Sequence, residues 1–314
     1  MEQSKVKNPR LAKFAKSLKR HWPLFIFLGP YALLFITFFI YPFFYGIYIS
    51  FFRWNLFEPS ASTYVGFENF QRALFGVGEI TIWRDYFWNG LRNTVLFVVL
   101  SVPFLIILPL IIAILLDLEP RFYKAFRVIF FMPTVLSVSA VAIIFKWQFD
   151  TNAGLVNGIL SLFGLGDTAW LNTQPGAWIV IVVTTIWWTI GTNTVIFGAG
   201  LKEVDKAQYE AAELDGCNYF KVLWHISLPN IRNQMFICTI TTIIASFNIY
   251  GQPHIITGGG PERTTTVLMM VIRGLLSGSN AQPGLAAAMA LLLGIVIISV
   301  SLIQHFHNKR QARE

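Results

Sequence analysis

Long apolar stretches alternate with shorter polar ones along the chain. A helix needs about 20 apolar residues to cross a bilayer, and six stretches are long enough. The first contains no Lys, Arg, Asp or Glu from residue 21 to residue 52. We place the spans at residues 24–50, 94–116, 128–147, 177–201, 233–250 and 285–304. The pattern predicts an all-α integral membrane protein, with a basic tail (residues 1–22), a domain of six transmembrane helices (23–306) and a short C-terminal tail (307–314).

Composition and charge agree with a membrane protein. Hydrophobic residues make up 55% of the 314 and charged residues only 13%, whereas a soluble domain carries about 25% charged residues. The net charge of +8 does not indicate nucleic-acid binding, because seven of the 24 Lys and Arg residues lie in the first 20 positions. That basic run is also too long, and the apolar run after it too extended, for a cleavable signal peptide.

The positions of the basic residues predict the orientation. They gather in the N-terminal tail, after the second span, between the fourth and fifth spans and in the C-terminal tail. Segments on the cytoplasmic side are enriched in Lys and Arg. We therefore expect a multi-pass protein of the bacterial cell membrane, with both termini and the polar segment 205–229 in the cytoplasm.

The polar segment 205–229 is predicted to fold into two short helices. Asp205 and Gln208 have the spacing of a capping box, and Gly216 stands where a helix end favours a positive φ. Asn218 can cap a second helix, which Pro229 would end before the fifth span. Such a segment is either a docking element or an amphipathic helix on the membrane surface without a partner.

The same segment carries a recognisable motif. A Glu-Ala-Ala triplet is followed after three residues by a glycine, and an Ile-x-Leu-Pro ending comes nine residues later, at Glu210, Ala211, Ala212, Gly216, Ile226, Leu228 and Pro229. This order resembles the EAA loop of membrane subunits of binding-protein-dependent ABC importers, where the loop is a coupling helix that docks in a cleft of a cytoplasmic ATPase. The resemblance implies coupling to the ATPase by Glu210, Ala211, Ala212, Asp215, Gly216, Tyr219, Phe220, Leu228 and Pro229.

Further matches extend the resemblance from the first span to the last. The carbohydrate-uptake branch of type I ABC importers, of the maltose and glycerol-phosphate kind, shows similar runs at residues 93–97, 126–133, 147–157, 256–261 and 284–294. The resemblance implies several partners: two ABC ATPase subunits that bind ATP and Mg²⁺, a second permease subunit, an extracytoplasmic solute-binding protein and a sugar substrate. The run ITGGGP is typical of one of the two permease subunits, which indicates a non-identical sister.

Energy is expected to come from those partners. The glycines before Pro261 do not form a phosphate-binding loop, because Glu262 and Arg263 follow where that loop needs Lys and Ser or Thr. We therefore expect a chain that is not an enzyme and binds no cofactor itself. All 16 Asp and Glu residues lie outside the predicted spans, whereas ion-coupled carriers usually keep a carboxylate inside the membrane. A secondary carrier and an integral membrane enzyme remain the less favoured classes.

The cysteines and histidines show no pattern of metal ligands. Cys217 lies in the polar segment and Cys238 in the predicted fifth span, and we expect both thiols to be free. The five histidines have no spacing typical of a metal site.

Neutral polar residues enrich the fourth and fifth spans. Their hydroxyl and amide groups can exchange hydrogen bonds with a sugar, while aromatic rings lie against its apolar faces. The alternative is hydrogen bonding between helices, worth about 0.6 kcal/mol per pair. The resemblance places Thr134, Ser137, Thr185, Thr189, Thr242 and Ser246 near the substrate site of the family, and the composition of the spans adds Trp187, Asn193 and Asn248.

The predicted outer side contains two further features. Segment 51–90 either receives the solute-binding protein or merely covers the outer rim of the bundle, with Trp54, Tyr64, Phe67 and Trp83 as candidate contacts. An ABC permease for another solute, such as a sugar phosphate or an amino acid, is an alternative. Three cations near the predicted mouth are compatible with an anionic solute: Arg92, Lys146 and Arg273.

Overall fold

The computed structural model describes residues 26–77, 81–278 and 280–311, so the predicted basic tail lies outside the described residues. Two short strands, β1 (Phe52–Arg53) and β2 (Thr63–Tyr64), pair antiparallel. The remaining elements are η1 (Ile36–Ile40), α2 (Tyr41–Ser50), η2 (Pro59–Ala61), α3 (Glu68–Leu74), α4 (Ile82–Asp117), α5 (Tyr123–Phe131), η3 (Met132–Val135), α6 (Val138–Gln148), α7 (Leu155–Leu162), α8 (Gly176–Lys202), α9 (Lys206–Leu214), α10 (Tyr219–Val222), η4 (Leu223–Ser227), α11 (Leu228–Asn230), α12 (Arg232–Phe247), α13 (Gly251–Ile256), α14 (Leu268–Gly274) and α15 (Pro283–Gln311). The predicted all-α class is confirmed.

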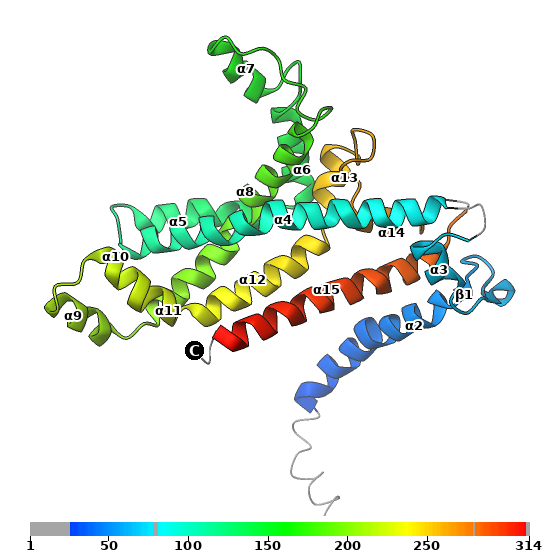
Figure 1. Cartoon of the computed structure of the whole chain (residues 1–314), viewed down its shortest axis with the longest axis horizontal. Helices are drawn as coiled ribbons and strands as arrows, with labels where there is room; N and C mark the ends of the chain where they lie inside the picture. Colours follow the sequence, from blue (N-terminus) through cyan, green and yellow to red (C-terminus); the bar gives the residue numbers. More distant parts are fainter. Residues whose placement is uncertain (1–25, 78–80, 279, 312–314) are drawn as a thin grey trace, which may run out of the picture.

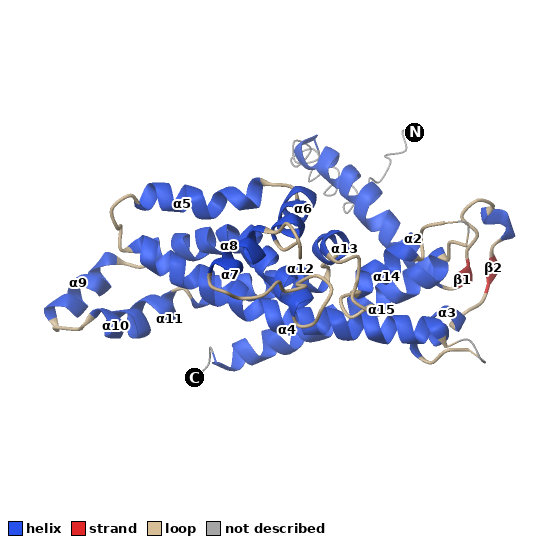
Figure 2. Ribbon diagram, turned by 90° about the horizontal axis from the view of Figure 1, so that it is seen from above, coloured by secondary structure: helices blue, strands red, loops and turns tan. Residues whose placement is uncertain are grey.

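Long apolar helices form the body of the molecule. Within the described residues, five helical segments are long and apolar enough to cross a membrane: Ile26–Ser50, Ile82–Asp117, Gly176–Lys202, Arg232–Ile256 and Pro283–Phe306. Helix α4 packs along α8 and α12, and α15 packs along α2. Helices α9 to α11 lie at one end of this bundle, whereas β1, β2 and α3 lie at the other (Figures 1 and 2). The two regions with candidate partners are therefore separated by the length of the bundle.

The predicted third span is broken. Helices α5 and α6 together have the length and composition of a span, but they meet at an angle of 100°. Pro133 lies at the break, where it removes a backbone N–H and clashes with the preceding turn. The chain is extended at Leu136 and Ser137, and the Ser137 hydroxyl accepts a hydrogen bond from the N–H of Ala140 at 3.2 Å to start α6. The predicted span at 128–147 is therefore present as a bent pair of helices rather than one continuous helix.

One predicted boundary is wrong, and another predicted span has an interruption near its end. Helix α4 begins 12 residues before the predicted second span, so residues 82–90 are helical and do not belong to a loop. Its first turns carry Arg84 and Asp85, and these charges led the hydropathy pattern to exclude the segment from the span. A carboxylate is nevertheless favourable there, because it lies at the positive end of the helix dipole. The fifth span is interrupted between Phe247 and Gly251, where α12 ends and α13 begins.

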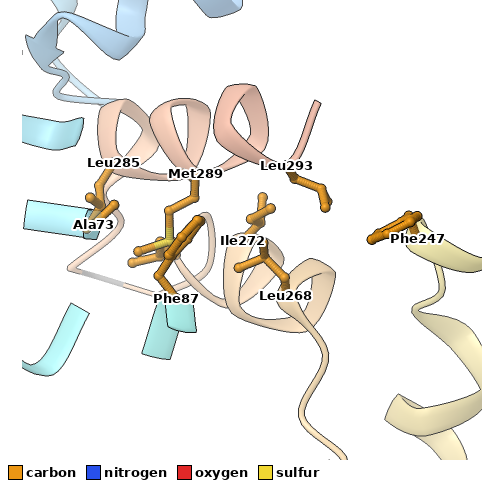
Figure 3. Close-up of a cluster of buried hydrophobic side chains, with 10 residues drawn as sticks. Ala73, Phe87, Phe247, Leu268, Ile272, Leu285, Met289 and Leu293 are labelled. Atoms are coloured by element: carbon orange, nitrogen blue, oxygen red, sulfur yellow. The ribbon is translucent and has the colours of Figure 1, made fainter. Parts of the chain in front are cut away.

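A buried cluster holds five helices together near the end that carries β1 and β2. Figure 3 shows α14 and α15 side by side, with their apolar side chains facing each other and Phe87 of α4. Gly284 lets the start of α15 approach β1, because a Cβ there would collide with the carbonyl oxygen of Phe52. The cluster consists of Ala73, Phe87, Phe247, Leu268, Ile272, Leu275, Leu285, Ala286, Met289 and Leu293.

Candidate functional site

A cavity of about 470 Å³ lies between α8 and the break that separates α12 from α13. We call it the threonine cavity. Six of the nine predicted path residues line it, namely Thr185, Thr189, Asn193, Thr242, Ser246 and Asn248. It is completed by Phe97, Leu105, Val138, Trp188, Thr192, Thr241, Ala245, Ile249, Tyr250, Gly251 and Gln252.

Three polar side chains of this lining have their donor hydrogens engaged by backbone carbonyls. Thr185 donates its hydroxyl hydrogen to the carbonyl of Ile181 at 2.8 Å, and Thr189 donates to the carbonyl of Thr185 at 2.7 Å. The Asn248 amide donates to the carbonyl of Ile244 at 2.8 Å. Since each hydroxyl oxygen has two lone pairs and an amide oxygen only accepts, these three side chains offer acceptor oxygens to a ligand in the cavity.

Asn193 is engaged by the protein itself. Its Nδ2 donates to the carbonyl of Leu105 at 2.8 Å and to the hydroxyl oxygen of Thr242 at 3.0 Å. In a regular helix the Leu105 carbonyl would accept from residue 109, but that residue is Pro109, which has no N–H. Asn193 therefore satisfies a carbonyl that the proline leaves open and joins α8 to α4 and α12.

One aromatic prediction is off by one residue. Trp187 does not line the threonine cavity; its ring contacts that of Phe145, with centroids 5.3 Å apart. Trp188 lines the cavity instead, and its Nε1 donates to the carbonyl of Leu136 at 3.0 Å. That bond fixes the indole at the hinge of the broken span.

Two hydroxyl residues from the broken span also lie outside the cavity lining. Thr134 donates to the carbonyl of Phe131 at 2.7 Å, and Ser137 is the N-cap of α6. Both stabilise the bend. The structure therefore does not bring Thr134, Ser137 and Trp187 together with the other predicted path residues.

The break after α12 supplies wall residues that the sequence pattern did not identify. Tyr250, Gly251 and the buried Gln252 line the cavity from the short connection and the start of α13. The signal was present, because Gly251 and Pro253 both interrupt a helical pattern. No charged side chain is among the residues that line this cavity in the described part of the chain.

The polar segment forms the predicted helical hairpin. The Asp205 carboxylate accepts from the N–H of Ala207 at 3.0 Å, and the Asn218 side chain accepts from the N–H of Lys221 at 2.9 Å. Gly216 has a φ of +69°, and the N–H of Cys217 reaches the carbonyl of Ala212 at 2.9 Å. This is the backbone pattern of a helix that ends on a left-handed residue, so both caps and the glycine turn are confirmed.

The second arm of the hairpin differs from the prediction. Pro229 does not end it: the π-helical turn η4 precedes the proline, and the helical path continues through α11 to Asn230. The wider turn accommodates a residue that lacks an N–H. The Gln208 side chain completes no capping box, since its oxygen accepts from the Asn230 amide at 2.9 Å. Together with a 3.2 Å hydrogen bond between the hydroxyls of Tyr209 and Ser227, this contact joins the two arms.

The tip of the hairpin exposes large apolar side chains. Leu214 is 90% exposed, Phe220 69% and Trp224 66%. Partial desolvation raises the pKa of Tyr219, whose side chain is still 44% exposed, and the negative charge of Asp117 at the end of α4 adds to this shift. Among the predicted coupling residues, Glu210, Ala211, Asp215, Gly216, Tyr219, Phe220 and Pro229 are exposed, whereas Ala212 is buried and Leu228 is half-buried.

The opposite end of the bundle carries the residues that were predicted to contact a solute-binding protein. Tyr64 and Phe67 are exposed beside β2 and α3. Trp54 packs edge-on against Tyr45, with ring centroids 5.7 Å apart. Trp83 lies in α4 and lines a second cavity, of about 690 Å³.

The chain is similar to a family of transport proteins and to several permeases. The family of binding-protein-dependent transport system inner membrane components matches residues 82–313. The chain is 30% identical to the sulfoquinovosyl glycerol transport system permease protein SmoG of Agrobacterium fabrum, over 79% of this chain and 78% of that protein. It is 28% identical to the probable ABC transporter permease protein YurN of Bacillus subtilis, over 89% and 94%. It is also 27% identical to the lactose transport system permease protein LacF of Rhizobium radiobacter, over 92% and 96%.

A solved structure has the same fold. The crystal structure of a bacterial ABC transporter involved in the import of the acidic polysaccharide alginate contains a chain that superposes with a TM-score of 0.75. The match covers 95% of this chain and 99% of that chain, at 22% identity.

Proposed function

This chain belongs to the family of binding-protein-dependent transport system inner membrane components, and on that premise we propose that it imports a saccharide as one half of the membrane path of an ABC transporter. The observation that carries the proposal is the threonine cavity. It lies among the long apolar helices, and its described lining is polar but uncharged. A carbohydrate needs many hydrogen-bond partners and no counter-charge, which this wall provides.

The chemistry of the cavity suits sugar hydroxyls. The hydroxyls of Thr185, Thr189 and Thr241 already donate to carbonyls of their own helices, so their oxygens can accept from an incoming hydroxyl. The Trp188 indole stands in the same wall and adds apolar aromatic surface for a sugar ring. The names of relatives support this class, since they include permeases for lactose and for arabinooligosaccharides.

We propose that the helical hairpin docks on a cytoplasmic ATPase. Exposed Leu214, Phe220 and Trp224 form an apolar tip beside the carboxylates of Glu210 and Asp215, and exposed apolar groups of this size mark a site for a protein partner. Two ATPase subunits would bind ATP and Mg²⁺, and one of them would receive this hairpin. In this orientation both termini lie in the cytoplasm, as the basic residues predict.

Packed side chains connect the hairpin to the helices of the bundle. The arms are joined by the contacts of Tyr209 with Ser227 and of Gln208 with Asn230. The next residue, Ile231, is fully buried against Phe197 and Leu201 of α8 and Ala113 of α4. ATP-driven closure of the ATPases would therefore move α12 against α4 and α8, two helices whose contact with α12 also encloses the threonine cavity.

The other end of the bundle is proposed to receive the solute-binding protein. Tyr64 and Phe67 are exposed there (Figure 1). We also propose a second, non-identical permease subunit, because the ITGGGP run is typical of one subunit of a pair.

Uptake by the assembled transporter tests the function. Vesicles that contain this chain, its sister permease and the ATPases are loaded with ATP and supplied outside with the solute-binding protein and labelled oligosaccharides. We expect at least one saccharide to accumulate, and only with hydrolysable ATP. If the binding protein carries saccharides but none of them enters, the proposal is wrong.

The docking role of the hairpin has its own test. Glu210→Lys reverses an exposed charge beside the apolar tip. We expect at least several-fold less ATPase to be retained when the chain is affinity-purified, since a charge of the wrong sign at an interface disfavours binding. Glu58→Lys makes the same change at the opposite end of the bundle and serves as the control. Equal retention of the ATPase by both variants would contradict docking at this hairpin.

A further inference from the structure

A second cavity, of about 690 Å³, adjoins the threonine cavity. Tyr250 lines both, so the two cavities meet at one aromatic side chain. We call it the arginine cavity, because Arg263 and Arg273 are the two arginines in its wall. Of the three cations predicted near the mouth, only Arg273 lines it.

Both guanidinium groups are held over tyrosine rings. The Arg263 Cζ lies 4.2 Å from the ring centroid of Tyr86, and the Arg273 Cζ lies 4.4 Å from that of Tyr250. The Tyr250 ring in turn stacks on the His254 ring, with centroids 4.9 Å apart. A cation over an aromatic face keeps its charge and the N–H groups on its edge available.

These two arginines differ from two others near the same end. In the part of the chain that the structure describes, the ion pairs join Arg53 to Glu68 at 2.8 Å and Arg84 to Asp85 at 2.9 Å. Neither Arg263 nor Arg273 takes part in these pairs. Two guanidinium groups in one concave wall, without a carboxylate among the described lining residues, make an attractive field for an anion.

The backbone around Arg263 is fixed in an unusual conformation. Its φ is +64°, in the left-handed region that non-glycine residues seldom adopt. The Asn93 side chain of α4 holds this turn by donating to the carbonyls of Arg263 and Thr266, both at 3.0 Å. A strained conformation of this kind persists where its surroundings impose it, often at a ligand site. The contacts of Asn93 therefore hold Arg263 in place in the cavity wall.

We propose that the arginine cavity binds the anionic group of an acidic saccharide on its way to the threonine cavity. The group is a carboxylate, sulfonate, sulfate or phosphate, each of which fits the forked donors of arginine. The neutral remainder of the molecule would then enter the hydroxyl-lined space beyond Tyr250. This inference rests on the proposed import of saccharides and narrows it to a charged class. The concave placement of the arginines favours a small ligand over the surface of a docked protein.

Uptake of matched saccharides tests the inference. The assembled transporter in vesicles is offered a trigalacturonate and the same trisaccharide with its carboxyl groups reduced to alcohols, and then a sulfated and a phosphorylated trisaccharide. For Arg263→Gln/Arg273→Gln we expect the ratio of charged to neutral uptake to fall about tenfold or more, because charge-assisted hydrogen bonds are lost. Arg84→Gln, which removes an arginine that is already paired with Asp85, should leave the ratio unchanged. The anion that shows the largest fall identifies the source of the charge.

A labelling measurement gives a second readout on the full chain. Phenylglyoxal modifies accessible arginines, and mass spectrometry of the wild-type assembly should show that the trigalacturonate protects Arg263 and Arg273 but not Arg53. The carboxyl-reduced trisaccharide should protect none of them.

The outcomes separate the two proposals. Uptake of neutral saccharides with no uptake or protection by any anionic one would overturn the arginine site and leave the proposed function standing. Weaker capture of the solute-binding protein by Arg263→Gln/Arg273→Gln, whatever the charge of its cargo, would also overturn it and assign the arginines to protein docking. If no saccharide enters with ATP, the proposed function fails and this inference fails with it.

Discussion

Asn193 shows how one side chain can join helices inside an apolar bundle. It closes the gap that Pro109 leaves in the hydrogen bonds of α4 and reaches Thr242 on α12. The sequence presented it as a polar residue of the substrate path. The structure adds a role in packing, because both amide hydrogen bonds are made to the protein and the residue is only 9% exposed.

Removing that amide should destabilise the fold. For Asn193→Ala we expect the free energy of unfolding to fall by about 1–3 kcal/mol, because a buried carbonyl at Leu105 loses its partner. The measurement is thermal or denaturant unfolding of the full chain in detergent. Asn172→Ala, at an exposed position in a loop, should change it by no more than about 0.5 kcal/mol. Equal stability of the two variants would contradict the bridging role.

Thr189 provides the residue-scale test of the threonine cavity. Thr189→Val keeps the shape of the side chain but removes an acceptor oxygen from the wall, so the KM for saccharide uptake should rise about two- to tenfold, as the loss of one neutral hydrogen bond predicts. Thr184→Val is the matched control, because Thr184 is fully buried, bonds the carbonyl of Val180 and does not line the cavity. A KM that responds equally to both changes would show that helix packing, rather than contact with the saccharide, explains the effect.

At the scale of elements, the hairpin depends on one backbone conformation. A Cβ at Gly216 would meet nothing within 4 Å, so space does not require glycine there, but its φ of +69° does. Gly216→Leu should abolish ATP-driven uptake while the chain still inserts and expresses, because the branched side chain resists this conformation and splays the two arms. Gly216→Asn should retain most uptake, since asparagine tolerates positive φ.

Both variants are compared by uptake into vesicles, normalised to the amount of inserted protein. Normal uptake by Gly216→Leu would count against a coupling role for the hairpin. Loss of uptake by Gly216→Asn as well would show that the side chain, and not the backbone angle, is what the partner rejects.

Local chemistry made the hairpin predictable. Caps and a glycine turn act within a few residues, so Asp205, Gly216 and Asn218 could be assigned from the sequence. The destination of the Gln208 side chain could not, because its partner Asn230 lies on the other arm. Contacts of that kind depend on how two elements meet, which spacing along the chain does not encode.

Hydropathy located the long helices but not their shape. A window average detects that residues 128–147 are apolar, yet the 100° bend is set by Pro133 together with the Ser137 cap. The same limit explains the exchange of Trp187 and Trp188. Neighbours on a helix point about 100° apart, and a span that is apolar on all sides gives no pattern that says which of the two faces the cavity.

At the scale of the whole molecule, the polar features form a line along the bundle. The hairpin lies at one end, and β1, β2 and α3 lie at the other (Figures 1 and 2). The threonine cavity is lined by residues of α4, α8 and α12 and shares Tyr250 with the arginine cavity. In the sequence these features are dispersed between residues 52 and 280. Their order along one axis is the property that a transport path requires, and only the packing of α4 against α8, α12 and α14 produces it.

This arrangement predicts that uptake is driven by an ATPase acting on the hairpin and not by an ion gradient. The carboxylates of α4 stand at its two ends, at Asp85 and Asp117, and the described lining of the threonine cavity contains none. An ion-coupled carrier usually needs a titratable group beside its path.

We therefore expect vesicles that contain this chain alone to accumulate no labelled saccharide under an imposed proton or sodium gradient. Vesicles with the complete assembly, ATP inside and the binding protein outside should accumulate it at the same rate before and after a protonophore collapses the gradient. Gradient-driven uptake by the chain alone would contradict this prediction, because it would show that this polypeptide transports without an ATPase. The exposed tip at Leu214, Phe220 and Trp224 would then need another partner.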